Sequence, residues 1–194
     1  MYPIELSFIE AYLQEKLSYE RLLHSKGVAK IAENLAEVYG IDPMRARIAG
    51  LSHDISREWT EDRILEYIKR NNIKTCQDLN DMPKLAHGIV GAEFLKSKLG
   101  IDDEEILEAI RSHSMGGPKM TKLQKIIFIA DFCESTRKMP KSREVLEVAQ
   151  QSLDKATLMT FEMILDYLKS KKMPICSEFL QNMEDFKRSI STRK

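Results

Sequence analysis

Residues that typically begin or end helices recur along almost the whole chain, and they constrain its fold more than any other feature. Between these residues, apolar residues recur at spacings of three and four, as on one face of an α-helix. Ser18 can cap a helix that Gly40 ends, and Asp42 with Pro43 can begin the next one. No segment alternates apolar and polar residues as a half-buried strand does. Since 194 residues suffice for one domain with a sizeable core, the sequence predicts an all-α, single-domain helical bundle.

The expected helices leave few long connections. They cover residues 3–17, 18–39, 44–55, 60–70, 84–99, 102–113, 121–134 and 142–171, with a last, more charged segment after Pro174. Residues 71–83 are the longest expected loop, with room for a short turn of helix. Asp102 and Glu105 have the spacing of a capping box, with Asp in place of Ser or Thr. The expected organisation is an N-terminal helix (1–17), a main domain (18–172) and a C-terminal helical segment (173–194).

Charge and cysteine content argue against several classes of protein. Thirty basic and thirty acidic residues cancel, so the net charge does not indicate a nucleic-acid or membrane partner. The three cysteines, Cys76, Cys133 and Cys176, show no CxxC spacing, which argues against a disulfide framework and fits a reducing compartment. The start of the chain lacks the pattern of a signal peptide, and no apolar run approaches the ~20 residues that cross a bilayer. We therefore expect a soluble, cytoplasmic protein.

All four histidines stand where a metal ligand could stand, together with two aspartates. They are His24, His53, His87 and His113, with Asp54 directly after His53 and Asp131 inside the apolar run 125–132. Taken alone, a histidine on an apolar helix face is more often a hydrogen-bonded core residue, and a salt bridge explains Asp131 as well as a metal does. Adjacent helical positions point about 100° apart, so packing alone does not easily satisfy both His53 and Asp54. Taken jointly, the positions favour a metal site, and imidazole with carboxylate suits iron, manganese or zinc.

The order and local context of these residues resemble a known family, the HD-domain metal-dependent phosphohydrolases. More narrowly, the chain is similar to the YqeK-type branch, the symmetrical dinucleoside tetraphosphatases of bacteria. The resemblance extends over roughly residues 15–165. The matching stretches are residues 21–29, 49–55, 85–88, 110–114 and 125–131.

The resemblance implies an HD-domain helical bundle that binds a dinucleoside polyphosphate and cleaves diadenosine tetraphosphate symmetrically into two ADP with a metal-activated hydroxide. It implies two divalent or trivalent metal ions, with iron preferred and manganese or zinc as alternatives. Carried over by position, one ion is held by His24, His53, Asp54 and Asp131. The second is held by His87 and His113, with Asp54 as the bridging, catalytic ligand that holds the hydroxide.

Cations near these ligands are candidates for binding the phosphate chain. Arg57 follows the His-Asp pair, Lys84 lies one helical turn before His87, and Arg137 follows Asp131. Taken singly, each is more often a solvated surface charge. Residues 134–137 read Glu-Ser-Thr-Arg, where the family usually has Glu-Pro-x-Arg. The missing proline leaves the metal ligands untouched and concerns the shape of the substrate loop.

Other functions remain open at the level of sequence. The same ligands serve related nucleotide phosphohydrolases, either nucleoside 5′-monophosphatases or hydrolases of cyclic nucleotides and guanosine polyphosphates. A non-catalytic nucleotide sensor or a purely structural bundle would lack turnover. Gly88 and Gly91 permit either close helix packing or room for a ligand. The amphipathic segment 4–17 could support a homodimer.

Overall fold

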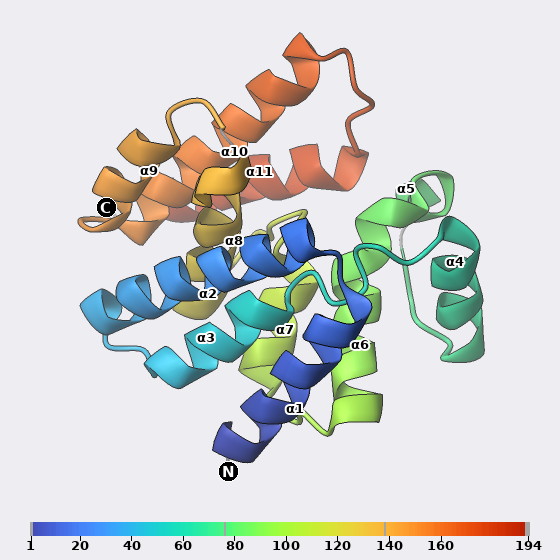
Figure 1. Ribbon diagram of the computed structural model, residues 1–194. Coiled ribbons are helices and arrows are strands. Elements are labelled where there is room, and N and C mark those ends of the chain that lie inside the picture. The colour runs from blue at the N-terminus through green and yellow to red at the C-terminus, as the bar shows by residue number, and fades with distance from the viewer. Residues whose placement is uncertain (1, 76, 138, 193–194) are drawn as a thin grey trace.

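The computed structural model describes residues 2–75, 77–137 and 139–192, and within these ranges it contains helices and turns but no strand (Figure 1). The all-α, single-domain prediction is confirmed. The helices are α1 (Tyr2–Lys16), α2 (Tyr19–Tyr39), α3 (Pro43–Ser52), α4 (Glu61–Arg70), α5 (Gln77–Asp81), α6 (His87–Leu99), α7 (Glu104–Ser112), α8 (Lys122–Cys133), α9 (Ser142–Ala149), α10 (Leu153–Ser170) and α11 (Ser177–Ser191), with 3-10 turns η1 (Pro83–Ala86) and η2 (Ser135–Arg137).

Helix α8 lies at the centre of the bundle, between the group α9–α11 and the group α1–α3 with α6 and α7 (Figure 1). It packs against α2, α3, α7, α9 and α10. Almost all of its side chains are buried, which is expected of a helix that is apolar all round. A capping box begins it: Thr121 accepts a hydrogen bond from the Gln124 backbone, and the Gln124 side chain accepts one from the Thr121 backbone. This packing carries Asp131 into the interior.

The buried apolar side chains of the described residues form two cores, and α8 contributes to both. One joins α8 to α1, α2, α3 and α7, with Leu13, Val28, Ile48 and Ile110 fully buried. The other joins Phe128 of α8 to α4, α6, α10 and α11, with the Phe128 and Phe161 ring centroids 4.7 Å apart. The C-terminal helix therefore completes the second core.

Helices α2 and α3 approach each other closely because α3 carries a glycine at the contact. A β-carbon added to Gly50 would lie 2.8 Å from the Ala29 α-carbon and 3.0 Å from the Ala29 nitrogen. Only a residue without a side chain fits against another backbone at that distance. The contact sets α3 directly against α2, the helix that carries His24, and His53 follows the last residue of α3.

Several expected boundaries are wrong by a few residues or more. Asp103, not Asp102, caps α7 and accepts hydrogen bonds from the backbones of Glu105 and Ile106. The expected helix 142–171 is two helices, because Ser152 adopts an extended backbone and caps α10 through the Lys155 nitrogen. The expected loop 71–83 contains α5 and the start of η1, whereas Cys76 lies outside the described residues. Among the described helices, none has both the length and the apolar character needed to cross a bilayer.

Candidate metal centre

The sequence-predicted ligands come together where five helices meet. His24 lies in the first turns of α2 and Asp131 lies near the end of α8. The other three histidines lie at helix ends: His53 follows α3, His87 begins α6, and His113 follows α7. All six side chains, including Asp54, are buried. Helix ends can bring polar side chains to one point without interrupting the apolar faces of the helices.

Three of the imidazoles are oriented in the same way. Each Nδ1 lies 2.7 Å from a backbone carbonyl oxygen three residues earlier. The pairs are His53 with Gly50, His87 with Lys84 and His113 with Ile110. Because a carbonyl oxygen can only accept, Nδ1 carries the hydrogen in each pair, and in the neutral ring Nε2 keeps a free lone pair. This is the usual arrangement of a histidine that binds metal through Nε2.

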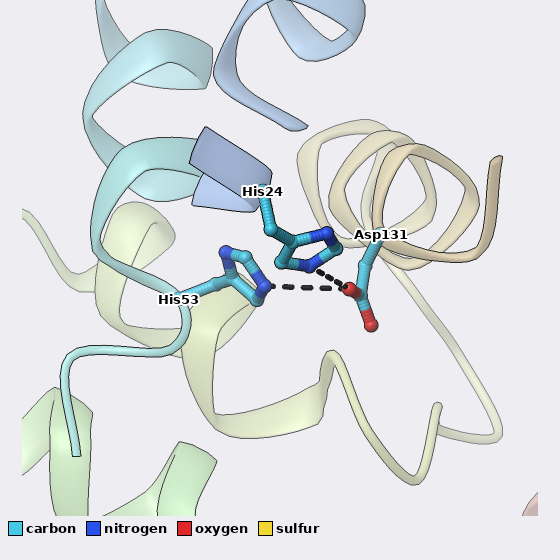
Figure 2. A group of neighbouring side chains, drawn as sticks. All are labelled: His24, His53 and Asp131. Atoms are coloured by element: carbon cyan, nitrogen blue, oxygen red, sulfur yellow. Dashed lines mark hydrogen bonds and ion pairs between the residues drawn. The ribbon is translucent and has the colours of Figure 1, made fainter. Parts of the chain in front are cut away.

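His24, His53 and Asp131 form the first group of ligand atoms. Figure 2 shows both imidazoles pointing at one oxygen of the carboxylate. Asp131 Oδ1 lies 2.9 Å from His24 Nε2 and 3.3 Å from His53 Nε2. Arg137 also reaches this oxygen, with its Nη2 at 2.6 Å. The group therefore contains two nitrogen donors and a carboxylate that a surface arginine holds in place.

Asp54 faces both pairs of histidines, one with each oxygen. Its Oδ2 lies 3.4 Å from His53 Nε2 and 3.9 Å from His24 Nε2. Its Oδ1 lies 3.1 Å from His87 Nε2 and 3.6 Å from His113 Nε2. A carboxylate can bridge two ions through its two oxygens, and Asp54 has the placement that such a bridge requires.

The residues fit a bound cation better than they fit one another. His53 Nε2 and Asp54 Oδ1 are buried and have no hydrogen-bond partner among the described residues. His87 Nε2 and His113 Nε2 lie 2.9 Å apart, although both Nδ1 atoms donate to carbonyls and neither neutral Nε2 has a hydrogen to share. Among the residues that the structure describes, two groups could hold a metal ion, His24 with His53 and Asp131, and His53 with Asp54 and His113. Which residues ligate which ion stays a prediction.

The charges of the site keep its carboxylates ionised. Burial raises the pKa of Asp54, but the neighbouring imidazoles, above all the charge of His53, outweigh it and hold that pKa well below its usual range. Burial also lowers the pKa of His53, but Asp54 and Asp131 raise it to about 10, so a bound cation would have to displace the proton from its Nε2. Burial, reinforced by the neighbouring imidazole of His113, lowers the pKa of His87 to about 4. The imidazole of His87 is therefore a neutral nitrogen donor at pH 7.

Two cavities open on either side of these ligands and share Arg57 and Arg137 in their walls. The larger, about 540 Å³, is lined mainly by polar side chains and by His24. The smaller, about 270 Å³, reaches His87, His113 and Asp131. Its apolar wall consists of Leu85, Phe128, Phe132, Met139, Ile164, Tyr167, Leu168 and Met173. Two unequal spaces therefore meet at the two shared arginines.

The three predicted phosphate-binding residues are placed differently from one another. Arg57 and Arg137 lie between the two cavities. Lys84 lies outside the lining of both, and its ammonium group donates instead to the Trp59 carbonyl. The 3-10 turn η1 replaces the helical turn that the spacing from Lys84 to His87 suggested.

Sequence reasoning missed two residues that contact the predicted ligands. Arg21 Nη1 donates to Asp54 Oδ2 at 2.7 Å. Glu134 Oε2 lies 2.7 Å from His24 Nδ1. Arg21 stands three residues before His24 and Glu134 three after Asp131, so each lies one turn from a ligand in sequence. That spacing was the available signal.

Comparisons with known proteins find relatives over most of the chain. Residues 21–136 match the HD domain family. A symmetrical bis(5′-nucleosyl)-tetraphosphatase of Bacillus subtilis (strain 168) is 33% identical over 165 residues, which cover 85% of this chain and 88% of the relative. One of the same name from Staphylococcus aureus is 35% identical over 148 residues, covering 73% and 74%. A crystal structure described as a predicted HD superfamily hydrolase involved in NAD metabolism, from Clostridium acetobutylicum, matches with TM-score 0.89 and 32% identity over 97% of this chain and 98% of that one.

Proposed function

This chain belongs to the HD-domain family, together with the symmetrical bis(5′-nucleosyl)-tetraphosphatases, and from this premise we propose how it works. It is a metal-dependent hydrolase that cleaves diadenosine tetraphosphate with water into two ADP. The observation that supports this most is Asp54, which turns one oxygen to each pair of histidines. A site for two ions suits a substrate whose four phosphates carry a high negative charge.

Six residues hold the metal in this proposal. One ion would be held by His24, His53, Asp54 and Asp131, and the other by His87 and His113 together with Asp54. When bound, the ions lower the pKa of water and neutralise charge on the phosphoryl oxygens. Asp54 Oδ1 is buried without a hydrogen-bond partner among the described residues, which supports a role for Asp54 in holding the attacking water. Asp54 is therefore the catalytic residue of the proposal.

The arginines of the site bind and orient the phosphate chain. Arg57 and Arg137 stand at the boundary of the two cavities, where a phosphate chain running from one to the other would pass. Guanidinium groups form charge-assisted, often bidentate hydrogen bonds with phosphate oxygens. The two arginines stabilise the negative charge that develops on the departing ADP, so this leaving group requires no proton donor. Lys84, whose ammonium binds the Trp59 carbonyl, must turn to join them.

The two cavities suit the two nucleosides of a symmetrical substrate. The smaller one offers apolar side chains, among them the partly exposed Tyr167, against which a base can stack. The larger one contains Arg21, Glu58 and Ser18, which suit a ribose or a solvated base. Cleavage at the arginines between the cavities leaves one nucleoside diphosphate on each side.

Iron is the proposed native metal, with manganese and zinc as alternatives. Nitrogen and oxygen donors without thiolate accept all three, so elemental analysis of the purified protein decides between them. The proposed location is the cytoplasm, in keeping with the free thiols of the buried Cys133 and Cys176. A homodimer remains a prediction that light scattering in solution tests.

Product analysis tests the proposed activity. Metal-loaded protein incubated with diadenosine tetraphosphate should yield ADP as its sole nucleotide product by chromatography. Asp54→Asn, which keeps the size of the side chain but removes its charge, should abolish turnover. Asp62→Asn, an equivalent change at an exposed residue of α4, should leave turnover intact. AMP with ATP, or hydrolysis of mononucleotides alone, would overturn the symmetrical cleavage, and nucleotide binding without turnover would indicate a sensor.

A further inference from the structure

Glu134 is a buried carboxylate that the proposed reaction does not use. It follows the last residue of α8 and is only 4% exposed. Its two oxygens accept hydrogen bonds from the Thr136 backbone at 3.1 Å, from the Thr136 hydroxyl and from the Ser135 hydroxyl at 3.2 Å. The remaining partner is His24, whose Nδ1 lies 2.7 Å from Oε2. The turn η2 therefore holds this carboxylate against the back of one predicted metal ligand.

His24 differs in this respect from the other three histidines. The others donate Nδ1–H to a neutral carbonyl three residues earlier on their own segment. His24 faces a carboxylate from a segment 110 residues later in the sequence. A carboxylate acceptor fixes the ring orientation and raises the basicity of the opposite nitrogen more than a peptide carbonyl does. We therefore expect the Nε2 of His24 to be the most strongly donating imidazole nitrogen in the centre.

The chain makes room for this contact with a glycine. Gly27 lies one helical turn after His24 on α2. A β-carbon at Gly27 would lie 2.7 Å from both Cγ and Oε1 of Glu134, well inside van der Waals contact. Any larger residue would push Glu134 away from His24. The glycine and the turn η2, which come from distant parts of the chain, are therefore matched to the same carboxylate.

We propose that Glu134 is a positioning residue that acts through His24 and makes the two metal positions unequal. The position formed by His24, His53 and Asp131 binds its ion more tightly than the position formed by His87 and His113. Ser135, which stands where the family usually has proline, and Thr136 support this function because their hydroxyls and one backbone N–H bind the carboxylate directly. This inference rests on the proposed metal centre but does not depend on the substrate.

Metal titration of Glu134→Gln tests the proposal without an activity readout. Protein stripped with chelator is titrated with Mn²⁺ in a calorimeter, and the wild-type chain should show a tighter and a weaker class of site. Glutamine keeps the size and the hydrogen-bonding oxygen but removes the charge, so the tighter class should weaken by about 10–100-fold. The weaker class should be unchanged. Gly27→Ala should have the same effect, because its β-carbon displaces Glu134.

Asp78→Asn is the matched control. Asp78 also accepts several hydrogen bonds, from Ser177 and Cys176 at the start of α11, but contacts none of the proposed metal ligands. It should lower thermal stability without changing either class of metal site. A Glu134→Gln protein that loses stability but retains both Mn²⁺ affinities would overturn the proposal and leave Glu134 as a support for η2.

Two further outcomes are separable. If Glu134→Gln does not fold, Thr136→Val replaces it, because this change removes only the hydroxyl donor to Glu134. Thr136→Val should weaken Mn²⁺ binding at the tighter class of site and leave the weaker class unchanged. Unchanged affinities at both classes would refute the proposal. If the wild-type chain binds no Mn²⁺, the metal centre and this inference fail together. If it binds two ions unequally but releases no ADP, the inference stands and the proposed substrate fails.

Discussion

Replacing Gly88 with alanine should disable one half of the proposed metal centre and spare the other. Gly88 follows His87 at the start of α6 and packs against the end of α7. An added β-carbon would lie 2.7 Å from the Ile110 carbonyl oxygen, about 0.7 Å inside the 3.4 Å at which ordinary contact begins. The Ile110 carbonyl oxygen accepts the hydrogen bond from His113 Nδ1. With alanine at position 88, α6 and this carbonyl, which orients His113, must move apart.

The size of this displacement decides its effect on metal binding. Metal–ligand distances tolerate deviations of about 0.2 Å, so a shift of about 0.7 Å exceeds what the His87–His113 pair can absorb. Overpacking of this kind costs about 1–3 kcal/mol. For a chain of this size, each 1 kcal/mol lowers the melting temperature by about 2–4 °C. We therefore expect a folded protein that melts about 2–12 °C lower and binds one ion instead of two.

The assay is elemental analysis of folded Gly88→Ala protein, with a thermal melt of the metal-free form. Gly91→Ala is the matched control on the same helix, because its added β-carbon would meet a methyl group of Ile55 at 3.0 Å rather than a backbone atom. That side chain can yield, and alanine gains about 1 kcal/mol of helix propensity over glycine. Gly91→Ala should retain both ions. A Gly88→Ala protein with two ions at wild-type affinity would refute the argument that close backbone approach positions the histidines.

Three further predictions concern substrate, stability and pH. Arg57→Ala should raise KM for diadenosine tetraphosphate about 10–100-fold and leave the metal content unchanged, because it removes a charge-assisted hydrogen bond worth about 1.5–3 kcal/mol. An unchanged KM would show that Arg57 does not bind the substrate. Gly116→Ala should lower the free energy of unfolding by about 3 kcal/mol, measured in urea. Gly116 has a φ of 64°, and an added β-carbon would lie 2.1 Å from Phe161 Cζ. A variant with wild-type stability would contradict that contact. Hydrogen bonds from Ser177 and its neighbour Cys176 lower the pKa of Asp78 in the folded protein. The ionised Asp78 therefore stabilises the fold fully above the unfolded pKa of about 3.9. This stabilisation is lost as the pH falls through the lower pKa of the folded state. The stability gap between wild type and Asp78→Asn should therefore close on acidification in urea titrations, and a gap that persists at the lowest pH would contradict this reasoning.

The convergence of the candidate ligands could be predicted from the sequence because their chemistry is conspicuous. A histidine pair with a neighbouring aspartate, and Asp131 in an apolar helix, have few satisfactory partners other than a cation. The structure brings all of the predicted ligands to one point, and a helical bundle with short connections makes such convergence possible. Residue type and helical spacing therefore predicted this part of the centre.

The supporting contacts were less predictable because they depend on tertiary packing. Arg21 and Glu134 resemble ordinary charged residues in sequence, and only the crossing of α2 and α8 brings Glu134 to His24. The break between α9 and α10, just before Ser152, contains no glycine or proline, so the local sequence did not indicate that a helix ends there. Lys84 has suitable spacing from His87, but a 3-10 turn directs its ammonium to a backbone carbonyl.

The most direct test of the central claim is hydrolysis of diadenosine tetraphosphate in ¹⁸O-labelled water, followed by mass spectrometry of the nucleotide products. Symmetrical attack on an inner phosphate predicts ADP as the sole nucleotide product, with one ¹⁸O in every second ADP molecule, in protein that contains two metal ions. Labelled AMP or ATP, or two bound ions without any label in ADP, would contradict the account.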